Sequence, residues 1–177
     1  MSDIATLIEN SGAIKRGKFK LSDGALTDYY IDKYVFETDP EVLEVIVEQL
    51  ADLLDDDVDV VAGPELGAIP LVTAVSLETY TPSIYVRKGE KHLGTQARIE
   101  GRLESGESVA ILEDVSTTGG TILETANLIE ELGGVVSQLI VVVDRNEGAV
   151  ENAKSQGYEL EYLVQIGENL EVENRSL

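Results

Sequence analysis

Two adjacent carboxylates, Glu113 and Asp114, follow the apolar run Val109–Leu112, and a turn rich in threonine and glycine, Ser116–Thr121, comes directly after them. The two glycines of the turn allow backbone amides to approach an anion, and a helix starting there would add the positive end of its dipole. Carboxylates accept hydrogen bonds from vicinal sugar hydroxyls and can hold a divalent cation by way of water. The segment therefore predicts a site for a phosphorylated sugar.

The acidic pair is weak evidence by itself, because the chain has 34 aspartates and glutamates and other acidic runs such as Asp55–Asp57. The order of strand, carboxylates, turn and helix strengthens the interpretation. No Gly-Lys-Ser/Thr follows the turn, which disfavours a Walker A loop, and the Gly-x-Gly-x-x-Gly spacing of a dinucleotide-binding fold is absent. The sequence therefore argues against a Walker A loop and against a dinucleotide-binding fold.

The lysines and arginines are few and clustered. Five of the 13 lie between Lys15 and Lys33, and five more lie between Arg87 and Arg102. A formal net charge of -21 repels nucleic acid and anionic membranes, so we expect neither as a partner. Because scattered solvating cations are nearly missing, the two basic clusters are candidates for anion binding.

The elements that would position these residues alternate along the chain. Apolar periodicity, turn residues and caps such as Asp39-Pro40 set their limits. We expect an α/β fold with a mostly parallel central sheet flanked by helices, and ligands beyond the carboxyl ends of its strands, after Gly63, Leu112 and Val143. The predicted strands cover 19–24, 29–36, 58–63, 83–86, 109–112, 135–143 and 160–166, and the predicted helices cover 3–10, 39–53, 68–77, 121–132 and 149–156.

Length and composition favour a single domain over residues 1–177, since 177 residues with 43% apolar content can build one sizeable core and no linker divides them. The absence of cysteine excludes disulfides, thiolate zinc sites and cysteine nucleophiles. With no predicted signal peptide or membrane span, we expect a cytoplasmic protein. Its acidity suggests a halophilic source, because about 1 M salt shortens the screening length to about 3 Å and removes most self-repulsion.

With the segment around Glu113 placed on a strand, turn and helix, the chain resembles the type I phosphoribosyltransferases, whose signature for phosphoribosyl pyrophosphate has this form. Three further segments resemble the orotate phosphoribosyltransferases, and the pattern is similar to archaeal and haloarchaeal members. The Arg-Lys loop and the Asp-Arg-x-Glu-Gly sequence are the most particular to that family. These segments are Leu21–Asp32, Arg87–Thr95 and Val143–Gly148.

The resemblance implies a small N-terminal hood over residues 1–36, approximately, and a mobile catalytic loop. It also implies transfer of the 5-phosphoribosyl group from phosphoribosyl pyrophosphate to orotate, which yields orotidine 5-phosphate and pyrophosphate on the route to UMP. Mg²⁺ would be the cofactor, held through the substrate near Glu113 and Asp114 without predicted direct side-chain ligation. Two chains of a homodimer would share each active site.

The same resemblance assigns roles to individual residues. A loop with Arg87, Lys88 and Lys91 would close over the leaving pyrophosphate, and Glu113 and Asp114 would bind the ribose hydroxyls. The 5-phosphate would be held by Ser116, Thr117, Thr118, Gly119, Gly120 and Thr121.

The acceptor side is less sharply defined. Arg145 offers a planar fork for the orotate carboxylate, although an ion pair with Glu147 is an alternative. Lys20 and Lys33 are weaker candidates for acceptor contacts. The chain departs from bacterial relatives, which carry lysines at the position of Ser22 and within Pro64–Gly67, and from the usual loop pattern, in which histidine directly precedes glycine and His92 does not.

Two other functions stay open. A phosphoribosyltransferase for a purine or uracil would share the Glu113 signature without needing Arg145 for a carboxylate. A non-catalytic regulator on the same fold would sense phosphoribosyl pyrophosphate, but fewer than twenty residues precede Phe19, too few for a helix-turn-helix module, and the charge opposes DNA contact.

Overall fold

A computed structural model describes residues 4–20, 26–87, 89 and 98–172. Its centre is a six-stranded sheet with the order β5-β4-β3-β6-β7-β8, in which β4, β3, β6, β7 and β8 run parallel and β5 is antiparallel to β4. The prediction of a mostly parallel sheet is therefore confirmed. The strands are β3 (Val60–Pro64), β4 (Ser83–Val86), β5 (Ile99–Glu100), β6 (Ser108–Ser116), β7 (Val135–Asp144) and β8 (Leu160–Gln165).

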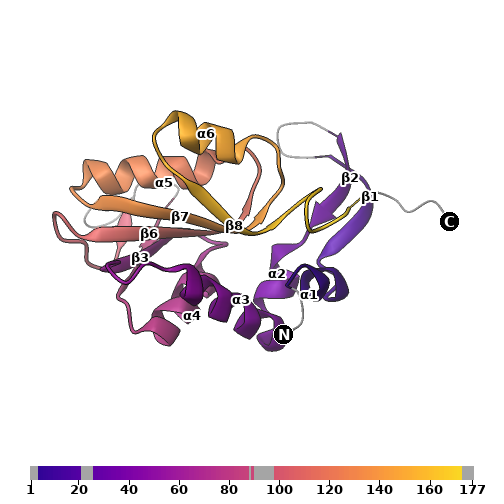
Figure 1. The fold of residues 1–177 in the computed structure, drawn as a ribbon, viewed down its shortest axis with the longest axis horizontal. Coiled ribbons are helices and arrows are strands. Elements are labelled where there is room, and N and C mark those ends of the chain that lie inside the picture. Colours follow the sequence, from indigo (N-terminus) through magenta and orange to yellow (C-terminus); the bar gives the residue numbers. More distant parts are fainter. Residues whose placement is uncertain (1–3, 21–25, 88, 90–97, 173–177) are drawn as a thin grey trace.

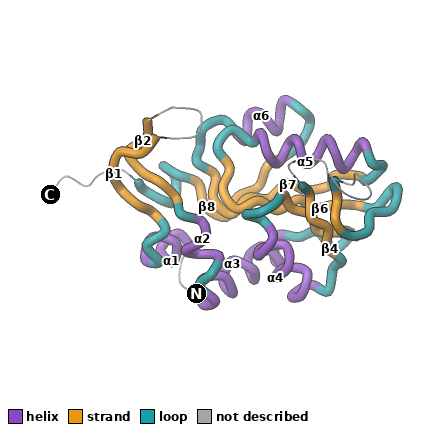
Figure 2. The backbone as a smooth tube through the Cα atoms, turned by 180° about the vertical axis from the view of Figure 1, so that it is seen from behind, coloured by secondary structure: helices purple, strands orange, loops and turns teal. Residues whose placement is uncertain are grey.

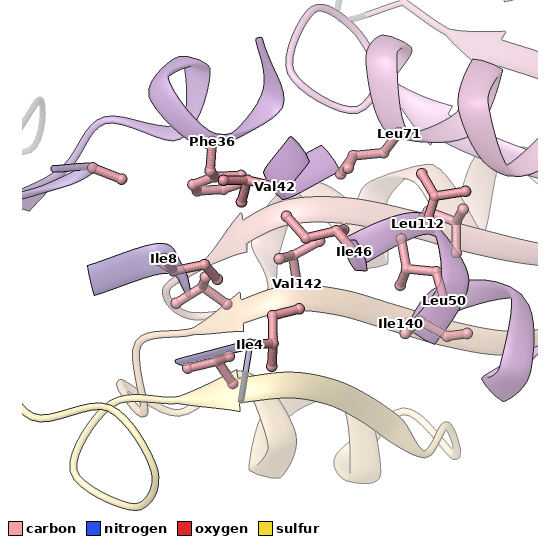
Figure 3. Close-up of a cluster of buried hydrophobic side chains, with 14 of the residues drawn as sticks. Ile4, Ile8, Phe36, Val42, Ile46, Leu50, Leu71, Leu112, Ile140 and Val142 are labelled. Carbon is pink, nitrogen blue, oxygen red and sulfur yellow. The ribbon is translucent and has the colours of Figure 1, made fainter. Parts of the chain in front are cut away.

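Helices cover both faces of this sheet. Figure 1 shows α3 (Pro40–Leu53) and α4 (Ile69–Thr79) on one face, and α5 (Gly120–Glu131) and α6 (Ala149–Ser155) on the other. Because successive strand residues point to opposite faces, Leu112 packs toward α3 and Ile111 toward α5. Figure 3 shows the first of these two cores, where Leu112 gathers with side chains of α3. None of the described helices is long and apolar enough to cross a membrane.

A second, two-stranded sheet lies at one end of the molecule (Figures 1 and 2). It pairs β1 (Ile14–Lys20) with β2 (Leu26–Ile31) in antiparallel register, Arg16 opposite Tyr29. The helices α1 (Ile4–Asn10) and α2 (Lys33–Glu37) flank it. This part of the chain corresponds to the expected hood.

The expected strand over 29–36 is wrong in its second half. The strand β2 ends at Ile31, and residues 33–37 form the helix α2. The alternation of large and polar residues continues past Asp32, but the fold buries the consecutive residues Phe36 and Glu37, which no half-buried strand would do. Tyr34 therefore lies on a helix.

The sequence suggested that Glu113 and Asp114 follow their strand. In the structure they lie inside it. Pairing of β6 with β7 continues to Ser116, opposite Asp144, so β6 is longer than its apolar run. The expected strand 19–24 is also shifted, since β1 ends at Lys20 and residues 21–25 lie outside the described part. The helix predicted from Asp39-Pro40 is confirmed: Asp39 caps α3 by accepting the Glu41 N–H at 3.0 Å.

Candidate functional site

Three turns converge at the carboxyl edge of the sheet, because β3, β6 and β7 are parallel neighbours and end at the same edge. The turn after β3 leads into α4, the turn after β6 into α5, and the turn after β7 into α6. This arrangement brings the predicted carboxylates, the phosphate turn and Arg145 to one edge.

The turn between β6 and α5 has the geometry of an anion site. Gly119 precedes α5 with φ of 77°, a left-handed conformation that a side chain would disfavour. No described residue accepts a hydrogen bond from the N–H groups of Thr118 or Gly119, whereas the Thr118 carbonyl accepts one from Asn152 at 2.9 Å. The turn is thus anchored on its carbonyl side and leaves amides for a ligand at a helix N-terminus.

Ser116 adds a second observation at the same place. Its side-chain oxygen is buried and finds no hydrogen-bond partner within the described residues. Buried polar atoms normally have partners, so an unpaired hydroxyl beside unused amides fits an absent polar ligand. The same turn and the first residues of α5 also contain Thr117, Thr118, Gly120 and Thr121.

Glu113 and Asp114 are both buried, at 6% and 5% exposure. As neighbours in a strand they point to opposite faces of the sheet. Asp114 accepts a hydrogen bond from the ammonium group of Lys33 on α2, and its other oxygen accepts the Val115 N–H. Only one of the two predicted carboxylates therefore faces α2.

The environment of Lys33 and Asp114 is crowded. A Cβ atom at Gly67, in the turn after β3, would overlap both the Asp114 carboxylate and the Lys33 ammonium. Burial alone would lower the pKa of Lys33, but the hydrogen bond and charge of Asp114, with a smaller effect of Glu37, raise it above its ordinary value. Lys33 is therefore charged and fixed on Asp114.

Glu37 is the site residue that the sequence analysis missed. It is 2% exposed, and neither carboxylate oxygen has a hydrogen-bond partner among the described residues. Burial, with the nearby charge of Asp114, raises the pKa of Glu37 to about 8, although Lys33 opposes the shift. Its four-residue spacing from Lys33 was a usable signal only if residues 33–37 were recognised as a helix.

Arg145 is buried at 7% exposure directly after β7. Its Nε lies 2.9 Å from Glu147 Oε1 and 3.2 Å from the Tyr29 hydroxyl, and its guanidinium carbon lies 4.6 Å from the centre of the Tyr29 ring. Burial raises the pKa of Tyr29, while the charge of Arg145 opposes the shift. The ion pair considered as an alternative exists, and it engages one nitrogen of the planar fork.

Some of the other cations predicted for the site are described and do not contact Arg145, and the others lie outside the described residues. Arg87 lines a cavity of about 250 Å³ together with Arg98 and Thr121. Arg87 also pairs with Glu100 at 3.4 Å, and Arg98 pairs with Glu124 at 2.9 Å. Lys20 ends β1 with an exposed side chain. Lys88, Lys91, His92 and Ser22 lie outside the described residues.

The described residues hold no group of three or more histidine, aspartate or glutamate side chains that could by itself bind a metal ion. Glu113 and Asp114 are nevertheless hard oxygen donors at the candidate site, of the type Mg²⁺ prefers. They fit a Mg²⁺ ion that is held mainly by a phosphorylated ligand and by water.

Comparison with known proteins gives consistent results. The family model described as "Phosphoribosyl transferase domain" matches residues 37–161. The chain is 44% identical to an orotate phosphoribosyltransferase of Haloquadratum walsbyi, covering 92% of this chain and 88% of that protein. It is 43% identical to the orotate phosphoribosyltransferase of Methanothermobacter thermautotrophicus, over 94% of this chain and 92% of that protein.

Solved structures agree with the sequence comparisons. The orotate phosphoribosyltransferase of Aeropyrum pernix superimposes with a TM-score of 0.84 at 30% identity, covering 94% of this chain and 95% of that one. The Mycobacterium tuberculosis enzyme, solved in complex with 5-phospho-alpha-D-ribosyl 1-diphosphate, gives 0.75 at 29% identity over 94% of this chain and 98% of that one.

Proposed function

The chain belongs to the phosphoribosyltransferase family, and from this premise we propose how its residues bind two substrates and promote one transfer. It catalyses transfer of the 5-phosphoribosyl group from phosphoribosyl pyrophosphate to orotate, which yields orotidine 5-phosphate and pyrophosphate on the route to UMP. The observation that carries the residue assignments is the junction of β6 and α5, where free amides, a buried hydroxyl and two carboxylates meet.

The turn between β6 and α5 binds the 5-phosphate of the donor. Three donors have no partner within the part of the chain that the structure describes: the N–H groups of Thr118 and Gly119 and the hydroxyl of Ser116. Thr117, Gly120 and Thr121 complete the cradle. The positive end of α5 favours the anion, and Gly119 permits close approach. Phosphate binding there fixes the sugar over the carboxyl edge.

Glu113 and Asp114 accept hydrogen bonds from the ribose hydroxyls. In the transfer, the bond from the sugar carbon to pyrophosphate breaks while a bond to a ring nitrogen of orotate forms, and that nitrogen loses its proton. Positive charge grows on the sugar and negative charge on the leaving group. Buried carboxylates beside the sugar stabilise the first charge more in the transition state than in the ground state.

Arg87, with Lys88 and Lys91 of the following loop, binds the departing pyrophosphate. The cavity of about 250 Å³ that Arg87 lines beside Thr121 supports this role. Guanidinium groups pair well with phosphate oxygens, so these cations stabilise the growing negative charge. Glu113 and Asp114 would help to hold Mg²⁺, which would supply further neutralisation of the negative charge on the leaving group.

Arg145 binds the carboxylate of orotate. The guanidinium carbon lies 4.6 Å from the centre of the Tyr29 ring and its Nε pairs with Glu147, so the other nitrogens keep a defined direction. A buried cation at this edge matches an acceptor that carries a carboxylate. Lys20, exposed at the end of β1, is a secondary candidate for acceptor contacts.

The assembly and setting complete the proposal. We place residues 1–177 in one domain. We also expect a homodimer with shared active sites. The apolar side chain of Leu66 lies beside the site and is 66% exposed, and a second chain would cover it. The cytoplasmic and halophilic character expected from composition remains a prediction.

The test is production of orotidine 5-phosphate from purified protein, orotate, phosphoribosyl pyrophosphate and Mg²⁺. Adenine, hypoxanthine and uracil are supplied in parallel as competing acceptors. The proposal expects orotate to be consumed and the other bases to be poor substrates. Preferred use of a purine or of uracil would favour the first alternative, and no product at any salt concentration would favour the sensing regulator.

A further inference from the structure

Glu37 is a buried carboxyl group that the transfer mechanism above leaves unused, and its surroundings point to a role. We propose that Glu37 is a positioning residue that receives the ammonium group of Lys33 when the ribose hydroxyls of the donor take Asp114. The inference rests on the proposed role of Asp114 in donor binding. Glu37 and Lys33 are the last and first residues of α2.

Lys33 and a sugar hydroxyl would compete for the same oxygen of Asp114. One of its oxygens accepts the Val115 N–H, and the other accepts Lys33 and lies so close to Gly67 that a Cβ atom there would overlap it. Asp114 is only 5% exposed, which limits the directions from which a second donor can approach. A hydroxyl that binds this second oxygen therefore competes with the ammonium group.

The displaced ammonium group, whose side chain is 30% exposed, would gain a charge-assisted hydrogen bond from a nearby carboxylate. Glu37 lies one helical turn from Lys33, on the same side of α2, and both of its oxygens lack hydrogen-bond partners among the described residues. Figure 1 shows α2 between the two-stranded sheet and α3, at the end of the central sheet. Lys33 and Glu37 already influence each other electrostatically, and we propose that the exchange occurs by reorientation of the lysine side chain.

Proton uptake and release follow from this exchange. The charged groups whose fields reach Glu37 are Asp114 of β6 and Lys33 of its own helix. With Lys33 on Asp114, the pKa of Glu37 is raised to about 8, so the free enzyme holds Glu37 protonated at pH 7. Pairing with Lys33 favours the charged form, so donor binding releases that proton.

The experiment compares the wild-type enzyme with Glu37→Gln, which keeps the shape and removes the charge that Lys33 would meet. Steady-state kinetics at pH 8 and calorimetry of donor binding in buffers of different ionisation enthalpy are measured. Glu37→Gln should raise KM for phosphoribosyl pyrophosphate roughly tenfold, the effect of one charge-assisted hydrogen bond, with little change in KM for orotate. It should also lose the donor-linked proton release.

The matched control is Glu44→Gln on α3, which makes the same charge change at an exposed position. The inference is overturned if Glu37→Gln behaves like this control, or if KM changes equally for both substrates. If Glu37→Gln does not fold, Lys33→Gln takes its place in the calorimetry, because without the ammonium group the proton release must also vanish. A wild-type enzyme that forms no orotidine 5-phosphate would defeat the proposed function instead.

Discussion

Replacement of Arg145 by alanine separates the two roles considered for this side chain, a partner of Glu147 and a binder of the orotate carboxylate. The guanidinium is 7% exposed, so its hydrogen bonds to a ligand form away from bulk water. Hydrogen bonds to charged groups contribute about 1.5–3 kcal/mol. At about 1.4 kcal/mol per tenfold, the variant should lower kcat/KM for orotate by about 10- to 150-fold.

Arg145→Ala should affect binding of phosphoribosyl pyrophosphate much less than binding of orotate. Arg145 follows β7, whereas the proposed phosphate turn follows β6, so we expect KM for phosphoribosyl pyrophosphate to change less than about threefold. Initial rates with each substrate varied in turn give both constants. Equal losses for the two substrates would refute the assignment of Arg145 to the acceptor.

Glu147→Gln is the matched control for Arg145→Ala. Glu147 is 40% exposed at its side chain, so its ion pair with Arg145 contributes at most about 1 kcal/mol. Removal of the pair should therefore change kcat/KM for orotate by less than about fivefold. A loss as large as that of Arg145→Ala would show that orotate use depends on the pair with Glu147, and not on the guanidinium nitrogens that Glu147 does not contact.

Further predictions concern Gly67, Gly119, Glu37 and salt. Gly67→Ala should raise KM for phosphoribosyl pyrophosphate and destabilise the fold by about 1–3 kcal/mol, because its Cβ overlaps Asp114 and Lys33; kinetics and denaturant titration would detect it. Gly119→Ala should lower the free energy of unfolding by about 1–2 kcal/mol, because alanine disfavours the left-handed φ at this position. It should also weaken donor binding, which equilibrium binding measurements would reveal. The pKa of Glu37 is raised from 4.5 to about 8, so between these pH values the folded state holds a proton that the unfolded chain loses. The free energy of unfolding of the wild type, relative to that of Glu37→Gln, should therefore decline from pH 5 to pH 8. A difference between the two free energies that stays constant in denaturant titrations across this range would contradict the shift. The melting temperature should rise strongly between millimolar and about 1 M salt, and equal melting at both would end the halophilic interpretation.

The sequence predicted the central sheet because its strands are largely apolar segments rich in valine and isoleucine. Val135–Val143 and Ser83–Val86 are examples, and both are strands in the structure with nearly the predicted limits. β5 escaped prediction because it has only two residues and no apolar run. The strand expected over 29–36 failed because periodicity alone cannot tell where Ile31 ends a strand and Lys33 begins a short helix.

The phosphate turn was predictable because all of its parts are contiguous in the sequence. The contact of Lys33 with Asp114 spans 81 residues, so no local pattern announces it. The contact of Arg145 with Tyr29 joins the residue that follows β7 of the central sheet to β2 of the small sheet, which the chain order does not reveal. Glu37 was hidden for a further reason: it is one of 34 acidic residues, and only its burial distinguishes it.

The central claim is that the junction of β6 and α5 binds the phosphoribosyl group. The most direct measurement is a crystal structure of the protein soaked with phosphoribosyl pyrophosphate and Mg²⁺. We expect the 5-phosphate within hydrogen-bond distance of the Thr118 and Gly119 amides and the Ser116 hydroxyl, with the ribose hydroxyls on Glu113 and Asp114. Donor bound elsewhere while this turn stays empty would contradict the account.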